Sequence, residues 1–177
     1  MGGDKMKHMK DYAYHYGLKV RIYPSDRQKE IIQRNADAAR FVYNELVAVN
    51  KEMGRFGRRN IYIDFIEQRV EELRDLIHSP KILKDRFPWL RHEDIDAQSI
   101  ANAKQNYQKA WQKYRRIHAA GMPRFHRKDS PCSYQTNPHY AKDKSISLWS
   151  SNVRFLDVHH LVLPKLKRIR FQGSKKI

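Results

Sequence analysis

Acidic side chains could support metal-dependent cleavage of a phosphodiester only if several of them gather around divalent cations. In this sequence they are scattered, and most lie where helices are expected to begin, a position at which a negative charge is favoured by the helix dipole. The residues concerned are Asp64, Glu67, Glu71, Glu72, Asp75, Glu93, Asp94 and Asp96. The spacing therefore predicts helix caps and solvated faces, and we expect no metal ligands among them.

Histidine and cysteine patterns do not indicate chemistry either. His159 and His160 are neighbours in an expected strand, where successive side chains point to opposite faces. Cys132 is the only cysteine, which excludes an intrachain disulfide and a zinc site built on paired cysteines. No glycine-rich phosphate loop occurs in the sequence. We expect no catalytic residues on this chain, no metal and no cofactor.

Basic residues interleaved with aromatic and amide residues give the strongest functional pattern. Lys and Arg total 36 against 19 Asp and Glu, which gives a formal net charge of +17. Four segments carry the pattern: residues 19–23, 40–44, 123–128 and 165–170. Cations bind phosphates, aromatic rings stack on unpaired bases, and amides can hydrogen-bond base edges. One such segment is equally consistent with the basic face of a packed element, but four in so cationic a chain predict a nucleic-acid partner.

These segments lie on a predicted strand and three predicted helices. Residues 14–23 alternate between apolar and polar types, which is typical of a half-buried strand. Ser25 and Gln28 form a capping-box pattern that begins a helix, expected to run to about Lys51 and to be stopped by Gly54 and Gly57. A second helix is expected from about Asp64 to Ser79-Pro80, followed by an irregular stretch, 81–90. The third has an apolar stripe from Ile100 to Ile117 and is capped by Asp94 or Asp96.

Short alternating segments follow at 145–149, 153–156, 160–163 and 168–171. Because a single strand has no hydrogen-bonding partners of its own, we expect the first strand to pair with these later ones. The sequence thus predicts an α+β fold, a small antiparallel β-barrel with an inserted three-helix domain. Residues 1–24 would hold the tail and first strand, 25–120 the helical insert, and 121–177 the remaining strands and basic loops.

No apolar run approaches the roughly 18 residues of a membrane span. The polar residues 1–10 contain no apolar signal core. These features predict a cytoplasmic protein with no membrane partner.

The order of several short motifs resembles the opening region of TnpB proteins, transposon-encoded relatives of the compact type V CRISPR nucleases. The blocks are residues 18–24 with Gln28, 39–44, 98–103, 110–114, 121–125, 133–134 and 163–169. They follow one another over nearly the whole chain. The resemblance implies a wedge-type barrel interrupted by a helical recognition domain, which is the topology that strand pairing also predicts.

The resemblance also implies a function. In that family this region grips a guide RNA and helps to open target double-stranded DNA beside a short adjacent motif, while a nuclease domain with catalytic carboxylates and a zinc ribbon follow it. Since the sequence stops at Ile177, both would be missing here. We therefore expect no cleavage by this chain alone, with a nuclease supplied by a separate chain or a full-length relative if at all.

Candidate binding residues follow from the basic segments and the resemblance. For RNA they are Lys19, Arg21, Tyr23, Arg40, Tyr43, Asn44, Arg124, Phe125, Arg127, Lys128, Lys165, Lys167 and Arg168; for DNA they are Tyr62, Gln98, Asn102 and Lys109. Gln98 and Asn102 are also consistent with ordinary surface amides. The spacing of Tyr107, Trp111 and Tyr114 favours a place in the helical core over base stacking, and Phe41 and Val42 are equally suited to the core.

Two alternatives remain at this stage. The first helices are also described in this family as a transposase helix-turn-helix, which would make the chain a plain duplex-DNA-binding regulator. The other alternative is a truncated partner or inhibitor of a full-length TnpB-like protein.

Overall fold

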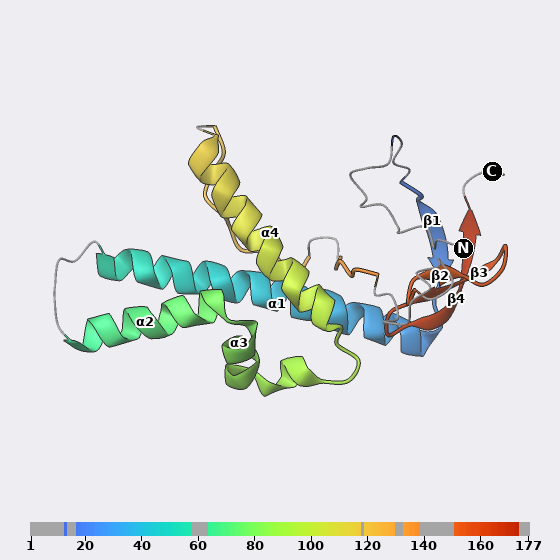
Figure 1. The fold of residues 1–177 in the computed structure, drawn as a ribbon, viewed down its shortest axis with the longest axis horizontal. Coiled ribbons are helices and arrows are strands. Elements are labelled where there is room, and N and C mark those ends of the chain that lie inside the picture. Colours follow the sequence, from blue (N-terminus) through green and yellow to red (C-terminus); the bar gives the residue numbers. More distant parts are fainter. Residues whose placement is uncertain are drawn as a thin grey trace, which may run out of the picture. The chain divides into compact units, whose positions relative to one another are not determined.

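The computed structural model describes residues 13, 17–57, 64–117, 119–129, 133–138 and 151–173. The chain divides into two compact units, one formed by residues 1–28 with 138–177 and the other by residues 29–137. The first unit contains an antiparallel sheet and the second contains the helices (Figure 1). The predicted α+β class is confirmed.

The sheet brings the first strand against the last one. Strands β1 (Val20–Tyr23), β2 (Arg154–Phe155), β3 (His160–Leu163) and β4 (Lys167–Gly173) lie in the order β1-β4-β3-β2, and all neighbours are antiparallel. The predicted pairing of the opening strand with the closing ones is therefore confirmed. β3 has the bounds expected from the sequence, whereas the described part of the first strand begins only at Val20. The expected strand at 145–149 lies outside the described residues.

The expected barrel is an open sheet over the described part of the chain. β1 and β2 form its two edges, and no ladder joins them there. Closing a sheet requires tilted strands with a consistent stagger around the whole ring, and packed small barrels use about eight strands. Four strands of two to seven residues do not curl far enough to bring β1 to β2.

One face of the sheet is apolar. Leu161 pairs with Ile169 across β3 and β4, and both side chains are buried together with that of Phe171. The ring of Phe155 on β2 lies 5.3 Å from the ring of Phe171, measured between centroids. Alternation along each strand thus gives the sheet unit a small core on one side and leaves the other side to polar residues.

Helix α1 (Asp26–Gly57) begins with the predicted capping box. The backbone N–H of Gln28 donates to Ser25 Oγ at 3.3 Å, and the backbone N–H of Ser25 donates to Gln28 Oε1 at 3.0 Å. Gln28 Nε2 also donates to the carbonyl oxygens of Leu166 and Arg168, each at 2.8 Å. One glutamine therefore caps the first turn of the helix and binds the backbone at the β3–β4 turn.

α1 is longer than the sequence predicted. It continues through Gly54 and ends at Gly57, where the prediction placed the end at about Lys51. A glycine inside a helix costs roughly 0.5–1 kcal/mol relative to alanine, which is too little to stop a helix that gains packing beyond it. Met53 and Phe56 provide that packing, because both contact the buried helical core.

The helical unit contains α1 from Lys29 onward, α2 (Asp64–His78), α3 (Pro80–Arg86), the 3-10 helix η2 (Pro88–Arg91) and α4 (Ala97–Arg116). α2 runs alongside α1, and α4 crosses α1 (Figure 1). The sequence predicted three helices, but the described residues form four α-helices, since α3 occupies the stretch expected to be irregular. Ser79 caps α3 by accepting the backbone N–H of Ile82, and Pro80 fits the first turn. The core is built from Val42, Leu46, Leu73, Leu76, Leu83, Leu90, Ile100 and Tyr107.

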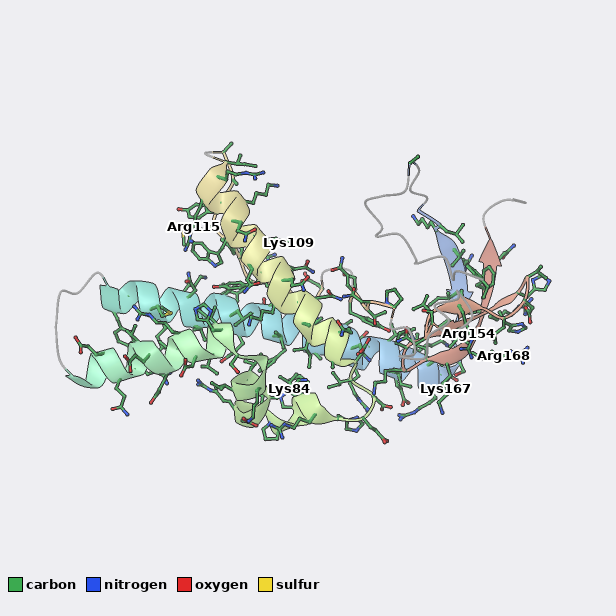
Figure 2. All side chains as sticks on the ribbon, in the orientation of Figure 1. Lys84, Lys109, Arg115, Arg154, Lys167 and Arg168 are labelled. Carbon is green, nitrogen blue, oxygen red and sulfur yellow. The ribbon has the colours of Figure 1, made fainter. Side chains whose placement is uncertain are left out.

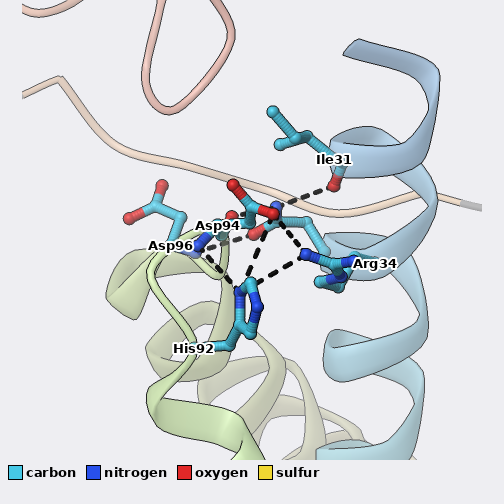
Figure 3. A network of polar contacts seen from close by, with 6 residues as sticks. Ile31, Arg34, His92, Asp94 and Asp96 are labelled. Carbon is cyan, nitrogen blue, oxygen red and sulfur yellow. Dashed lines mark hydrogen bonds and ion pairs between the residues drawn. The ribbon is translucent and has the colours of Figure 1, made fainter. Parts of the chain in front are cut away.

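A buried polar network fixes the start of α4 against α1 (Figure 3). Asn35 is fully buried and its amide nitrogen donates to the carbonyl oxygens of Ile31 and Asp94, each at 2.8 Å. Its amide oxygen accepts the backbone N–H of Asp96 at 2.8 Å and the hydroxyl of Ser99 at 3.3 Å. Asp96 then caps α4 by accepting the N–H of Gln98, so Asp96, and not Asp94, is the cap.

Asp94 has a different partner. Its carboxylate forms an ion pair with Arg34 on α1, and the imidazole Nδ1 of His92 lies 3.3 Å from Nη1 of Arg34 (Figure 3).

None of the helices in the described part of the chain is long and apolar enough to cross a membrane.

Candidate nucleic-acid interface

The strand register gathers basic side chains on one face of the sheet. In antiparallel pairs, directly opposite residues share a face. Arg21 on β1 lies opposite Gln172 on β4. Arg170 on β4 lies between Tyr23 on β1 and His160 on β3. Val162 on β3 lies between Arg168 on β4 and Arg154 on β2. We call the resulting surface the basic sheet face; its polar residues are Arg21, Tyr23, Arg154, His160, Arg168, Arg170 and Gln172, and Val162 lies between Arg154 and Arg168 on it. In the described part of this unit, the acidic residues are Asp26 and Asp157, neither of which lies on a strand.

Tyr23 stands between two guanidinium groups on this face. The guanidinium carbon of Arg21 lies 5.5 Å from the Tyr23 ring centroid, and that of Arg170 lies 5.7 Å from it. The Tyr23 hydroxyl donates to Gln172 Oε1 at 2.5 Å. The ring is 41% exposed even so, which leaves it accessible to a base. An exposed aromatic ring beside cations is the combination that binds single-stranded nucleic acid by stacking and phosphate contacts.

The other end of the basic sheet face contains a histidine held by an acid. His160 Nδ1 lies 2.9 Å from Asp157 Oδ2, and a guanidinium nitrogen of Arg168 lies 3.3 Å from the same imidazole nitrogen. The hydrogen bond from the His159 backbone N–H, together with His160, lowers the pKa of Asp157. Asp157 thus stays charged and orients the imidazole beside Arg168.

The sheet residues predicted to bind RNA occupy three places. Arg21, Tyr23 and Arg168 lie on the basic sheet face, and Lys19 is exposed just before β1. Lys165 and Lys167 lie at the β3–β4 turn with positive φ values of 63° and 57°, a region that non-glycine residues rarely adopt. Sequence reasoning missed Arg154, His160 and Gln172 as members of this face, and it placed Arg170 in the basic segment 165–170 without naming it as a candidate. Only the cross-strand register reveals them.

The segment 121–129 lies along α1 in the helical unit, although the sequence placed it with the strands. Asn44 holds it in place. Its amide nitrogen donates to the carbonyl oxygen of His126 at 2.9 Å, and its amide oxygen accepts the His126 backbone N–H at 2.8 Å. Lys51 Nζ lies 4.1 Å from the Phe125 ring centroid. Of the predicted RNA-binding residues, Arg124, Phe125, Arg127 and Lys128 are exposed on this segment.

The predicted residues on α1 mainly support this packing. The Asn44 amide is engaged as described, and Arg40 is paired with Asp37 at 2.5 Å. Tyr43 is 7% exposed, and its ring stacks on that of His126 with centroids 4.0 Å apart. Burial raises the pKa of Tyr43. Val42 is buried in the core, and Phe41 packs against it.

The polar face of α4 contains no acidic side chain. Lys109 is exposed on it, and Arg115 lies over the ring of Trp111 (Figure 2). Asn102, predicted to contact DNA, is 7% exposed and donates to the Gln135 carbonyl oxygen at 3.0 Å. Gln98 is half-buried and accepts from Asn137 at 3.4 Å. Tyr62, the fourth predicted DNA contact, lies outside the described residues.

The aromatic stripe on α4 is mainly in the core, as its spacing predicted. Tyr107 is 3% exposed, and Trp111 packs against the core. Tyr114, near the end of the helix, is 37% exposed, so the prediction of a core position is wrong for this residue. Burial raises the pKa of Tyr107 to about 12. Among the residues that the structure describes, no group of three or more His, Cys, Asp or Glu side chains is arranged to hold a metal ion.

A family model described as a helix-turn-helix domain, HTH_OrfB_IS605, matches residues 15–54. This match supports an N-terminal region of the transposon-encoded OrfB/TnpB type, in agreement with the motifs seen in the sequence. No curated protein matches the chain. Within the matched range, the helical residues belong to one uninterrupted helix, α1, preceded by the strand β1.

Proposed function

We propose that this chain is the nucleic-acid-binding module of a TnpB-like RNA-guided system, related to compact type V CRISPR effectors. It binds a guide RNA and helps to recognise target double-stranded DNA beside a short motif. It performs no cleavage itself, and a nuclease acts from a separate chain or a full-length relative. The single observation that carries the proposal is the basic sheet face, in which an exposed tyrosine stands between arginines.

The chemistry of that face favours RNA. A sheet surface with an exposed aromatic ring and flanking cations suits an unpaired strand, whose bases can stack while arginines bind its phosphates. The β3–β4 turn adds Lys165 and Lys167 to the same unit. The transposon-type match at residues 15–54 supports a DNA-directed, transposase-related role for the protein as a whole.

The polar face of α4 is the part proposed to approach DNA. Its exposed residues include Gln105, Lys109, Gln112, Lys113 and Arg116, and no acid interrupts them. Such a face binds phosphates without repulsion, and its amides can hydrogen-bond base edges. The buried Asn102 contributes by holding residues 135–137 against the helix.

The plain helix-turn-helix regulator is less consistent with the geometry. That motif requires two helices joined by a turn of three or four residues, with the second helix in the major groove. Residues 26–57 form a single helix of 32 residues, so the region matched by the helix-turn-helix model does not itself contain the two-helix unit.

The proposal is tested by purifying the full chain and sequencing the nucleic acid that copurifies. Fluorescence anisotropy then measures binding to that RNA, transcribed and labelled, and to duplex DNA of random sequence. With on the order of 6 to 10 phosphate contacts, RNA affinity should fall about 10³- to 10⁵-fold between 50 and 200 mM salt. Structured RNA from one locus supports the proposal. Bare protein that prefers duplex DNA would favour the regulator instead.

Matched variants locate the interface. Replacing Arg168 and Arg170 with glutamine should weaken RNA binding at least tenfold. It should also make the slope of log affinity against log salt concentration shallower, by the amount that about two phosphate contacts contribute. The control replaces Lys81 and Lys84 of α3, which removes equal charge from a helix that carries none of the proposed contacts. Equal losses in both double variants would mean that binding follows net charge alone and not the basic sheet face.

Catalysis is tested separately. The purified chain, incubated with Mg²⁺ and the target DNA or the copurified RNA, is expected to leave both intact. Specific cutting that persists through repurification would overturn this part of the proposal.

A further inference from the structure

A cavity of about 320 Å³ in the helical unit is lined by residues of α1, of α4 and of the segments 121–129 and 133–138. Three of its lining residues are small: Ala39 on α1, which is half-buried, and Ser99 and Ala103 on α4, which are buried. Its volume is within the usual range for small-molecule sites. Larger side chains at these three positions would fill the space.

The walls of the cavity are two chain segments that amide groups fasten to the helices. Asn44 binds both backbone polar groups of His126, which holds the segment 121–129 on α1. Asn102 donates to the backbone of Gln135, and Asn106 donates to its side chain at 3.1 Å, which holds the segment 133–138 on α4. The cavity is therefore a built feature, since each wall has specific hydrogen bonds to a different helix.

The lining is aromatic, amide and cationic, without a carboxylate. His126 is stacked on Tyr43, and Tyr134 lines the cavity from the other segment. Asn106 and Gln135 are exposed amides in the lining, and Arg127 is an exposed cation in it. Aromatic surfaces suit a base, amides suit its polar edge, and a guanidinium suits a phosphate. Together, these three kinds of group match the three parts of a nucleotide that a protein can bind.

We propose that this cavity receives a single unpaired nucleotide of the bound nucleic acid. The base enters beside His126 and Tyr134, its edge meets Asn106 and Gln135, and its phosphate meets Arg127. Bases turned out of a strand are commonly held in this way, by stacking and by hydrogen bonds to their edges. The inference rests on the proposed function, because it assigns a place to one nucleotide of the polynucleotide.

Alanine methyl groups give a direct readout of the cavity. The full chain, with ¹³C-labelled alanine methyl groups, is titrated with uridine 5′-monophosphate, adenosine 5′-monophosphate, inorganic phosphate, and short single-stranded RNA and DNA. The methyl signals of Ala39 and Ala103 should shift with the nucleotides and the oligonucleotides. Those of Ala36 and Ala38, which are buried but do not line the cavity, should stay in place.

Two variants test the walls. Tyr134→Leu should weaken nucleotide binding about tenfold, as expected for the loss of one aromatic–base stack. Arg127→Gln, at an exposed position, should weaken the binding of both monophosphates severalfold. Lys81→Gln, outside the cavity, should bind as the wild type does.

The outcomes separate this inference from the proposed function. RNA binding by anisotropy without any shift at Ala39 and Ala103 would overturn the cavity site and leave the RNA-binding module standing. Equal shifts with inorganic phosphate alone would also overturn it, because they indicate an anion site only. Loss of all RNA binding would remove the proposed function and this inference with it. RNA and DNA oligonucleotides that shift the two methyls alike show that the site accepts either sugar.

Discussion

Amide side chains join remote parts of this chain. Asn35, Asn44 and Asn102 each bind backbone groups more than 30 residues away in sequence, and Gln28 binds backbone 138 and 140 residues away. An amide contains both a donor and an acceptor, so it can satisfy two backbone groups at once in place of a sheet or helix partner. These residues therefore stabilise the fold in positions where sequence reasoning sees polar surface groups.

Gln28→Ala is the first test of this role. The change removes the return bond of the capping box and two hydrogen bonds to the β3–β4 turn, and it should lower the free energy of unfolding by about 1–2 kcal/mol. Urea unfolding followed by circular dichroism measures this. Gln68→Ala, at an exposed position on α2, is the matched control and should change stability by less than about 0.5 kcal/mol. Equal effects of the two substitutions would contradict the anchoring role of Gln28.

Tyr107 gives a prediction on pH. Its native pKa is raised to about 12 by burial, whereas an unfolded tyrosine ionises near 10. As the pH rises, Tyr107 therefore loses its proton first in the unfolded state. The neutral buried phenol contributes its full stability below pH 10, and this contribution declines as the pH rises from 10 towards 12. Tyr107→Phe should reduce this decline by up to about 1.4 kcal/mol per pH unit. Urea unfolding at pH 9, 10 and 10.5 measures the slope, and an unchanged slope would show that Tyr107 is not buried as a neutral phenol.

At the scale of the elements, α1 shows why the end of a helix is hard to predict. The last turns contain Gly54, yet the helix continues because Met53 and Phe56 pack on the core. Helix propensity is local, and packing is not, so a sequence pattern that includes a glycine predicts an end too early.

Gly54→Ala should stabilise the protein. A Cβ atom at this exposed position would meet nothing within 4 Å, so the substitution gains helix propensity without a clash. The expected increase in the free energy of unfolding is about 0.5–1 kcal/mol, and Gly54→Val should give a smaller gain because its branched side chain loses rotamer freedom in a helix. Thermal and urea unfolding compare the three proteins. A loss of stability in Gly54→Ala would mean that α1 does not extend through this residue.

The sequence predicted the elements better than the site. Alternation predicted β3, the lack of partners for a lone strand predicted that β1 pairs with the later strands, and the apolar stripe predicted α4. The site depends on tertiary geometry that no local pattern contains. Arg154 and Arg170 join the basic sheet face only through the cross-strand register, and the amides of Asn44 and Asn102 are engaged by backbone groups 82 and 33 residues away.

At the scale of the whole molecule, the excess of positive charge has two opposite consequences. A net charge of +17 on a folded chain produces self-repulsion, which dissolved salt screens. Salt also weakens binding to nucleic acid, because it screens the attraction and reduces the free energy gained when counterions leave the phosphates. The free protein and its complex should therefore respond to salt in opposite directions.

Thermal unfolding of the free protein should show this directly. Raising NaCl from 20 to 200 mM should increase Tm, and each 1 kcal/mol of relieved repulsion corresponds to about 2–4 °C for a chain of this length. Over the same range the RNA complex should lose affinity. Replacing Lys109 and Lys113 with glutamate lowers the net charge, so this variant should have a smaller salt-dependent rise in Tm. Because both residues are exposed on α4, the substitution removes no core contact. A Tm that fell with salt in the wild type would mean that attractive ion pairs, such as Arg69 with Glu52 and Glu72, outweigh the repulsion. In that case, relief of repulsion between positive charges would not be what nucleic acid contributes on binding.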